Sequence, residues 1–261
     1  MDAIGIVDTL PLWALYLVTV AIVLLSVEVG WRLGRLRRRR AEGEKDAPIG
    51  AVVGAALGLL AFLLAFTFGM SASRFDTRKQ MVLQESNAIG TTYLRAEMLP
   101  EPQRSEIRNL LRGYAALRVQ GVTSLMTSET MAQSGVIQDR LWADAVVLGA
   151  QSPNSIVVGL FIQALNDMID LDAERVTAGR NRIPETIWMA LYLVTILTMA
   201  AMGYQFGLTG TRSWAVTILL ALVFAAVFLL IADLDRPQSG FLKVSQQPMI
   251  DLIDKIGAPM P

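Results

Sequence analysis

The side chains that most often carry out enzyme chemistry are scarce in this sequence. It has no cysteine and no histidine, which excludes thiolate nucleophiles, imidazole bases, disulfides and the usual zinc sites. Ser73 and Ser86 therefore have no histidine to activate them, and no phosphate-binding loop or nucleotide fingerprint is present. Only carboxylate chemistry remains, so we expect that the protein is not an enzyme.

Two sets of acidic residues could attract a cation. Asp233 and Asp235 follow the last apolar segment in the sequence DLDRP. Their two carboxylates alone supply fewer than the roughly six to eight oxygen ligands that Ca²⁺ takes. The alternative is structural, with Asp235 paired to Arg236 or capping a helix at the membrane interface. The second set consists of Asp167, Asp170 and Glu174. Its simpler interpretation is a solvated helix face, or ordinary salt bridges to neighbouring arginines. The residues themselves thus predict no cofactor.

The most distinctive spacing is that of two phenylalanines among small residues. At about 100° per residue, seven positions share one face of a helix: Ala51, Ala55, Gly58, Phe62, Phe66, Gly69 and Ser73. One explanation is close helix packing, because Gly50, Gly54 and Gly58 repeat at the four-residue spacing that lets backbones approach. The other is a pore-lining helix, in which Phe62 and Phe66 of several subunits form a hydrophobic constriction that controls wetting.

These residues belong to a chain whose hydrophobicity is concentrated in blocks. Of its 261 residues, 53% are hydrophobic, and four nearly uncharged segments are long enough to cross a hydrocarbon core of roughly 30 Å. They are Leu12–Val29, Ile49–Ser71, Thr186–Phe206 and Ser213–Ala232. We therefore expect an all-α membrane protein with four transmembrane helices in two pairs, inserted as a multi-pass protein in the cell (inner) membrane.

The segment between the second and third spans predicts a helical domain. Proline positions and capping residues indicate four helices: Arg78–Met98, Pro102–Thr127, Glu129–Ala150, and a fourth that starts at Ser152 and Pro153 and ends near Ala178. The predicted organisation is a first helix pair over residues 1–72, a helical domain over 73–183, a second pair over 184–234 and a C-terminal tail over 235–261.

A dense cluster of positive charge follows the first span. It comprises Arg32, Arg35, Arg37, Arg38, Arg39, Arg40 and Lys45, whereas the N-terminal tail has no lysine or arginine. The positive-inside rule places this loop in the cytoplasm and the helical domain outside. The cluster could also bind anionic lipid headgroups, or simply solvate the loop. Nucleic-acid binding is not expected, because the run is short and tied to the membrane surface.

The run FLLAFTFGMSASRF resembles the second membrane helix of bestrophins, which are anion channels. The matching positions are Phe62, Ala65, Phe66, Arg74 and Phe75. The whole chain resembles a bacterial family of bestrophin-like membrane proteins through three blocks, at residues 73–114, 181–188 and 233–249. It departs from bestrophins in that the first ring of their constriction falls here at Gly58, which has no side chain to form a gate.

The resemblance implies a homopentamer with one axial pore for small inorganic ions, most readily anions. The second membrane helix would line the pore, with Phe62 and Phe66 at its constriction, and the helical domain would continue it. Basic side chains at the pore mouth would concentrate anions there: Arg74, Arg78 and Lys79. Bestrophins that respond to calcium use an acidic run after the last membrane helix, so the resemblance makes calcium at Asp233 and Asp235 the metal alternative. Bestrophins also place the helical domain on the side opposite to that given by the charge rule. The alternative function is a non-conducting membrane scaffold or sensor whose helical domain binds a partner or ligand.

Overall fold

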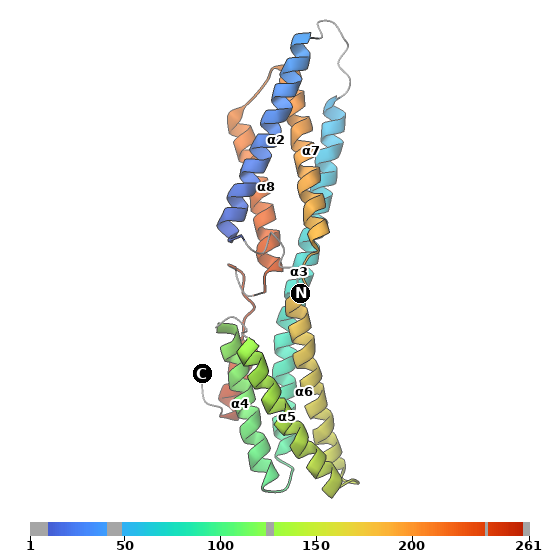
Figure 1. Cartoon of the computed structure of the whole chain (residues 1–261), viewed down its shortest axis with the longest axis vertical. Coiled ribbons are helices and arrows are strands. Elements are labelled where there is room, and N and C mark those ends of the chain that lie inside the picture. Colours follow the sequence, from blue (N-terminus) through green and yellow to red (C-terminus); the bar gives the residue numbers. More distant parts are fainter. Residues whose placement is uncertain (1–9, 41–48, 124–127, 238–239, 258–261) are drawn as a thin grey trace. The chain divides into compact units, whose positions relative to one another are not determined.

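The computed structural model describes residues 10–40, 49–123, 128–237 and 240–257, which are helical with no strand among them (Figure 1). The helices are α2 (Leu12–Arg40), α3 (Ile49–Ala96), α4 (Gln103–Thr123), α5 (Ser128–Gln151), α6 (Ile156–Arg180), α7 (Glu185–Thr209), α8 (Trp214–Asp235) and α9 (Gln247–Ile256). The all-α prediction is confirmed. The chain divides into a membrane unit, Met1–Arg74 with Arg182–Leu242, and a helical domain, Phe75–Asn181 with Lys243–Pro261.

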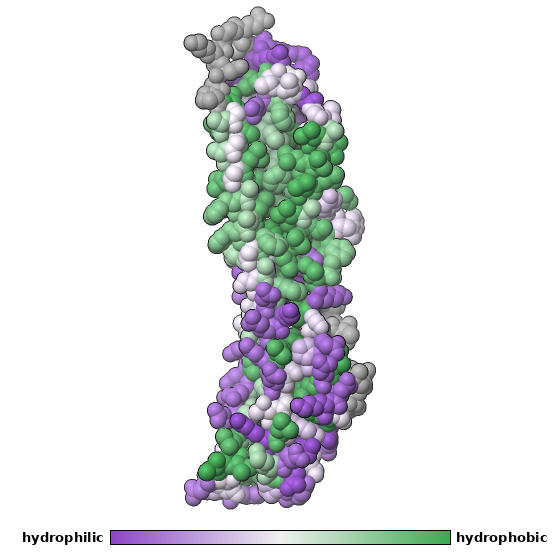
Figure 2. Space-filling model, turned by 180° about the vertical axis from the view of Figure 1, so that it is seen from behind, coloured by the Kyte–Doolittle hydropathy of each residue, from purple (hydrophilic) through white to green (hydrophobic). Residues whose placement is uncertain are grey.

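Four helical stretches in the described ranges are long and apolar enough to cross a membrane. They are Leu12–Arg40, Ile49–Ala96, Ile156–Thr209 and Trp214–Asp235. The first three contain a predicted span each, and the fourth matches the last predicted span to within one residue at its start. Their side chains cover the membrane unit with an almost continuous apolar surface on the face seen in Figure 2. A surface of this kind is stable against lipid, so the predicted layout of four membrane helices in two pairs is confirmed.

The closest helix packing in the membrane unit is between α2 and α7, through glycines on both helices. A Cβ atom built on Gly30 would overlap the carbonyl oxygen of Ala200, and one built on Gly203 would overlap that of Val27. Gly34 and Gly207 make the same kind of approach one turn further on. Each helix thus has a pair of glycines four residues apart, which is the spacing that lets two backbones touch in a membrane.

Gly203→Ala should therefore destabilise the membrane unit strongly. The added methyl group would meet a backbone carbonyl, which cannot rotate away as a side chain can. We expect a loss at or above the upper end of the usual cost of overpacking, about 1–3 kcal/mol, measured as a lower Tm of the purified protein. Gly54→Ala is the matched control, because its Cβ would meet nothing within 4 Å. An equal loss in both variants would contradict the close approach of α2 and α7.

Helix α3 is longer than the sequence predicted. Separate helices were expected over Ile49–Ser71 and Arg78–Met98, but one helix runs from Ile49 to Ala96. The sequence changes from apolar to charged between these two ranges, but no glycine or proline lies between Ala72 and Thr77. A change in polarity does not end a helix, because it leaves the backbone hydrogen bonds intact.

Two further differences concern capping and the C-terminus. Ser155, rather than Ser152, is the N-cap of α6, and its side chain accepts a hydrogen bond from the backbone N–H of Val158. The predicted C-terminal tail contains α9, which buries Met249, Leu252, Ile253 and Ile256. These side chains join the core of the helical domain. The tail therefore contributes to folding rather than only following the last span.

The helical domain has a compact apolar core with a network of buried charges beside it. Ile107, Leu111 and Tyr114 of α4 are fully buried. Beside them, the carboxylate of Glu85 is completely buried and pairs with Arg118 at 2.6 Å and with Arg175. Arg118 also reaches Asp172 at 2.7 Å. The network joins the second half of α3 to α4 and α6.

Candidate functional site

Helix α3 is attached to the membrane unit along one narrow stripe. Val53, Leu60, Leu64, Thr67 and Ser71 are buried, and their spacing of three, four or seven residues places them on one face of the helix. At 100° per residue, this stripe lies about 170° from the face centred on the two phenylalanines. The predicted site therefore faces away from the other helices of the membrane unit.

Every residue of the predicted face is exposed in the single chain: Ala51, Ala55, Gly58, Phe62, Phe66, Gly69 and Ser73. The side chains of Phe62 and Phe66 are 66% and 63% exposed. Cβ atoms built on Gly54, Gly58 and Gly69 would meet nothing within 4 Å. Gly54 and Gly58 therefore do not serve helix packing among the described residues, which leaves this face of α3 open to lipid, water or another subunit.

The surface beside Phe66 is hollowed. An open depression of about 540 Å³ is lined by Ala65, Phe66, Gly69, Met70, Ser73 and Arg74. All six residues belong to α3, so the depression is a shallow groove along one helix rather than an enclosed cavity. It arises because Gly69 and Ser73 are small next to the ring of Phe66, which leaves room for a neighbouring helix or for water.

The three basic residues that follow the span differ in exposure. Arg74 is partly buried, and its Nη1 lies 3.6 Å from Oδ1 of Asp235. Arg78 is only 5% exposed, whereas Lys79 is exposed. Of the three, Lys79 is therefore the one whose charge is available to solvent and ions.

Asp233 and Asp235 are buried and organise the chain around the end of α8. The Asp233 carboxylate accepts hydrogen bonds from the backbone N–H groups of Phe241 and Leu242, at 2.8 and 3.1 Å. Both oxygens of Asp235 accept from the N–H of Ile183, at 3.1 and 3.2 Å. All four carboxylate oxygens thus accept a hydrogen bond from a backbone N–H group, which gives both residues a structural role at the end of α8.

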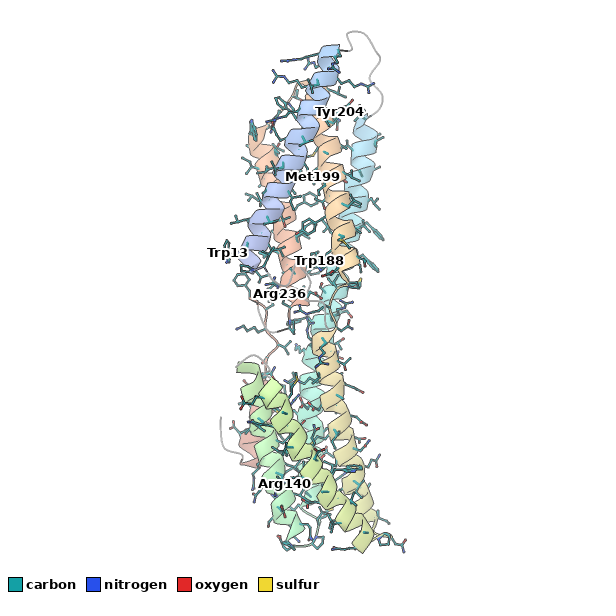
Figure 3. All side chains as sticks on the ribbon, in the orientation of Figure 1. Trp13, Arg140, Trp188, Met199, Tyr204 and Arg236 are labelled. Atoms are coloured by element: carbon teal, nitrogen blue, oxygen red, sulfur yellow. The ribbon has the colours of Figure 1, made fainter. Side chains whose placement is uncertain are left out.

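Arginines complete this end of the membrane unit. Arg182 Nη1 donates to the backbone oxygen of Asp235 at 2.8 Å. Arg236, which Figure 3 labels at the end of α8, donates to the carbonyl oxygen of Leu10 at 2.5 Å. Within the described ranges, no group of three or more acidic or histidine side chains is placed to hold a metal ion. The hydrogen bonds of Arg182 and Arg236 hold the segment that precedes α7 and the residue that follows α8 in place.

The acidic helix face predicted in the helical domain remains at the surface. Asp167, Asp170 and Glu174 are exposed, and Asp170 accepts a hydrogen bond from Asn166 at 2.9 Å. The acidic residues with buried roles are Glu85 and Asp172, which the sequence did not single out. Burial alone disfavours the charged form of Arg118, but the adjacent Glu85 carboxylate raises its pKa, so the ion pair stays charged.

Comparison with known proteins gives a consistent family assignment. The family model described as "Bestrophin-like domain" matches residues 20–249. No curated protein matches the chain by sequence. The crystal structure of a bacterial bestrophin homologue from Klebsiella pneumoniae is similar over 94% of this chain and 98% of that one, with a TM-score of 0.66 and 16% identity. A single-residue variant of that homologue matches over 94% and 95% of the two chains, with a TM-score of 0.66 and 14% identity.

Proposed function

The chain belongs to the bestrophin-like family, and on that premise we propose that it is an anion channel formed by several copies of this chain in the cell inner membrane. Family membership makes it an ion-channel-type membrane protein rather than an enzyme. The proposal adds a homopentamer around one axial pore, small inorganic anions as the permeant species, and a constriction at Phe62 and Phe66. Its surroundings are membrane lipids and the neighbouring subunits.

The observation that supports the proposal is the exposed face of α3. Small residues on this face would let equivalent helices from several subunits come close to one axis. The same face presents Phe62 and Phe66, two large apolar side chains that are 66% and 63% exposed. Rings of such side chains hold water off a narrow pore and close it without blocking it physically.

The helical domain provides a second observation in favour of an oligomer. Several large apolar side chains are 54–79% exposed on it: Leu94, Met98, Val136, Val146 and Ile156. Exposed apolar side chains on a domain outside the membrane favour contact with another protein surface. In the proposed oligomer that surface is a neighbouring subunit. The same observation favours the alternative function, a scaffold or sensor whose helical domain binds a different protein.

Conduction by the purified protein tests the proposal. Full-length protein reconstituted in planar bilayers should give discrete single-channel currents, and a chloride gradient should shift the reversal potential toward that of chloride. A homogeneous protein that gives no current under any gradient or voltage would support the scaffold or sensor instead.

Lys79→Gln should lower the preference of the channel for anions. An exposed positive charge after the span raises the local anion concentration, and the effect is screened over a Debye length of about 8 Å at physiological salt. We expect a reversal potential closer to zero under a salt gradient, with the difference from wild type shrinking at high salt. Lys255→Gln, another exposed lysine, is the control. Unchanged selectivity in Lys79→Gln would remove this residue from the conduction path.

A further inference from the structure

Tryptophans mark both ends of the membrane unit. Trp13 is 68% exposed at the start of α2, at one end of the unit, and Tyr204 lies toward the other end (Figure 3). Trp31 lies eighteen residues after Trp13 on α2, a rise of about 27 Å in a helix. This is close to the hydrocarbon thickness of a bilayer, roughly 30 Å. Since tryptophan prefers the interface, Trp31 marks the level of the lipid headgroups.

A fixed arginine lies beside Trp31, in the connection between α7 and α8. Arg212 Nη1 is 2.7 Å from Oε2 of Glu28, and its guanidinium carbon lies 3.6 Å above the ring of Trp214 and 4.8 Å from that of Trp31. Only 10% of the Arg212 side chain is exposed. Its Nε has no hydrogen-bond partner within the described part of the chain. The carboxylate and the two rings therefore hold one guanidinium in place while part of its donor capacity stays unused.

Two further arginines of α2 converge on the same place. The guanidinium of Arg35 lies 5.1 Å from the ring of Trp31. Arg38 reaches the α7–α8 connection, because a Cβ atom built on Gly210 would overlap its guanidinium. Gly210 ends α7 with a φ of 73°, a left-handed conformation that favours glycine. The close approach and the positive φ both require glycine here, which leaves room for Arg38.

This end of the membrane unit has an excess of positive charge. Between Glu28 and Pro48 the sequence has seven basic and four acidic residues, and Arg212 adds another positive charge. Glu28 is shared between Arg212 and Arg32, whose Nε lies 2.8 Å from its Oε1. Such an excess of positive charge attracts the phosphate groups of anionic lipids at the membrane surface.

We propose that Arg35, Arg38 and Arg212 bind the phosphate of an anionic phospholipid, with Trp31 and Trp214 against its glycerol region. Planar guanidinium groups match phosphate oxygens in pairs of hydrogen bonds. Trp214 is 57% exposed at the start of α8, and Ile218 and Leu222, which follow it along the same side of the helix, are apolar and 43% and 39% exposed. An apolar surface that continues below a cluster of arginines fits a lipid with acyl chains, whereas a free phosphate ion would use only the arginines.

Native mass spectrometry of the full-length protein tests this site. Phosphatidylglycerol should bind at least tenfold more tightly than phosphatidylcholine, and excess inorganic phosphate should not displace it. Arg35→Gln with Arg38→Gln should lower the affinity for phosphatidylglycerol about tenfold or more, since each basic residue near an anionic surface contributes about a fivefold factor. Adding Arg212→Gln should lower it further. The double variant leaves the Glu28–Arg212 pair intact, so its folding should match wild type in thermal unfolding.

The control removes three exposed basic residues of the helical domain, Arg140, Lys243 and Lys255, by substitution with glutamine. It should bind phosphatidylglycerol as wild type does. Equal affinity for the two lipids, or unchanged binding in the triple variant at Arg35, Arg38 and Arg212, would overturn the proposal. Displacement of the lipid by inorganic phosphate would assign the arginines to a free anion. A change in the mass of the oligomer without a change in lipid binding would assign them to a subunit interface.

Discussion

Replacing Phe62 and Phe66 together with alanine should open the channel while the protein remains folded. In the proposed oligomer these rings stand in the pore, so their removal enlarges the lumen instead of leaving a cavity in a packed core. A wider constriction is easier to wet, and a wet constriction conducts. We expect a large increase in open probability or leak in planar bilayers, with a thermal stability close to that of wild type.

Leucines on the opposite face of α3 provide a matched control. Leu60 and Leu64 are 0% and 4% exposed and pack against the membrane unit. Leu60→Ala with Leu64→Ala removes two apolar side chains from the same stretch of the same helix. Each truncation of a buried leucine costs about 2–5 kcal/mol, so this variant should lose stability without gaining leak.

The opposite outcome would give the phenylalanines a packing role between subunits. If Phe62→Ala with Phe66→Ala lowers the Tm of the oligomer and adds no leak, the rings fill an interface, because deleting a buried phenylalanine commonly costs about 3–5 kcal/mol. If stability and conductance are both unchanged, the rings face lipid. Either result contradicts a constriction at these two residues.

The second large effect is expected at Glu85 in the helical domain. Glu85→Gln keeps the shape of the side chain but removes the negative charge that Arg118 and Arg175 share. Breaking a buried ion pair on one side leaves an uncompensated charge and costs about 3–5 kcal/mol. We expect a marked decrease in Tm and faster hydrogen exchange in α4 and α6, which the network joins.

Glu97→Gln is the control for Glu85→Gln. Glu97 also pairs with an arginine, Arg108 at 3.7 Å, but its side chain is 59% exposed. An exposed pair contributes about 0–1 kcal/mol, so the control should unfold almost as wild type does. Equal stability of the two variants would mean that the buried network does not hold the domain together.

Long elements were predictable from the sequence because their signals are local. Runs of about 20 apolar residues have one explanation in a chain of this composition, and the helices of the helical domain follow from proline and capping positions. Helix α9 was not predicted although its signal was present: Met249, Leu252, Ile253 and Ile256 follow the helical spacing over ten residues. The glycine pairs of α2 and α7 were missed for a different reason. Gly50, Gly54 and Gly58 show the same four-residue spacing, and spacing alone does not say which repeat meets another backbone.

The candidate site, too, could be predicted from the sequence only in part. The face that contains Phe62 and Phe66 depends only on helical periodicity, so it could be defined from the sequence, and it is intact in the structure. The partners of Arg74 and Arg212 could not be predicted. Asp235 lies more than 150 residues beyond Arg74 in the chain, and Arg212 lies more than 150 residues beyond Trp31. Contacts of this kind depend on how the helices pack, which periodicity within one helix does not determine.

Cryo-electron microscopy of the full-length protein in lipid nanodiscs tests the central claim most directly, because it shows what covers the exposed face of α3. The proposal predicts a closed ring of five subunits, with α3 of each nearest the symmetry axis and with Phe62 and Phe66 directed at that axis in two stacked rings. A monomer, or an oligomer in which both phenylalanines face the lipid, would contradict it.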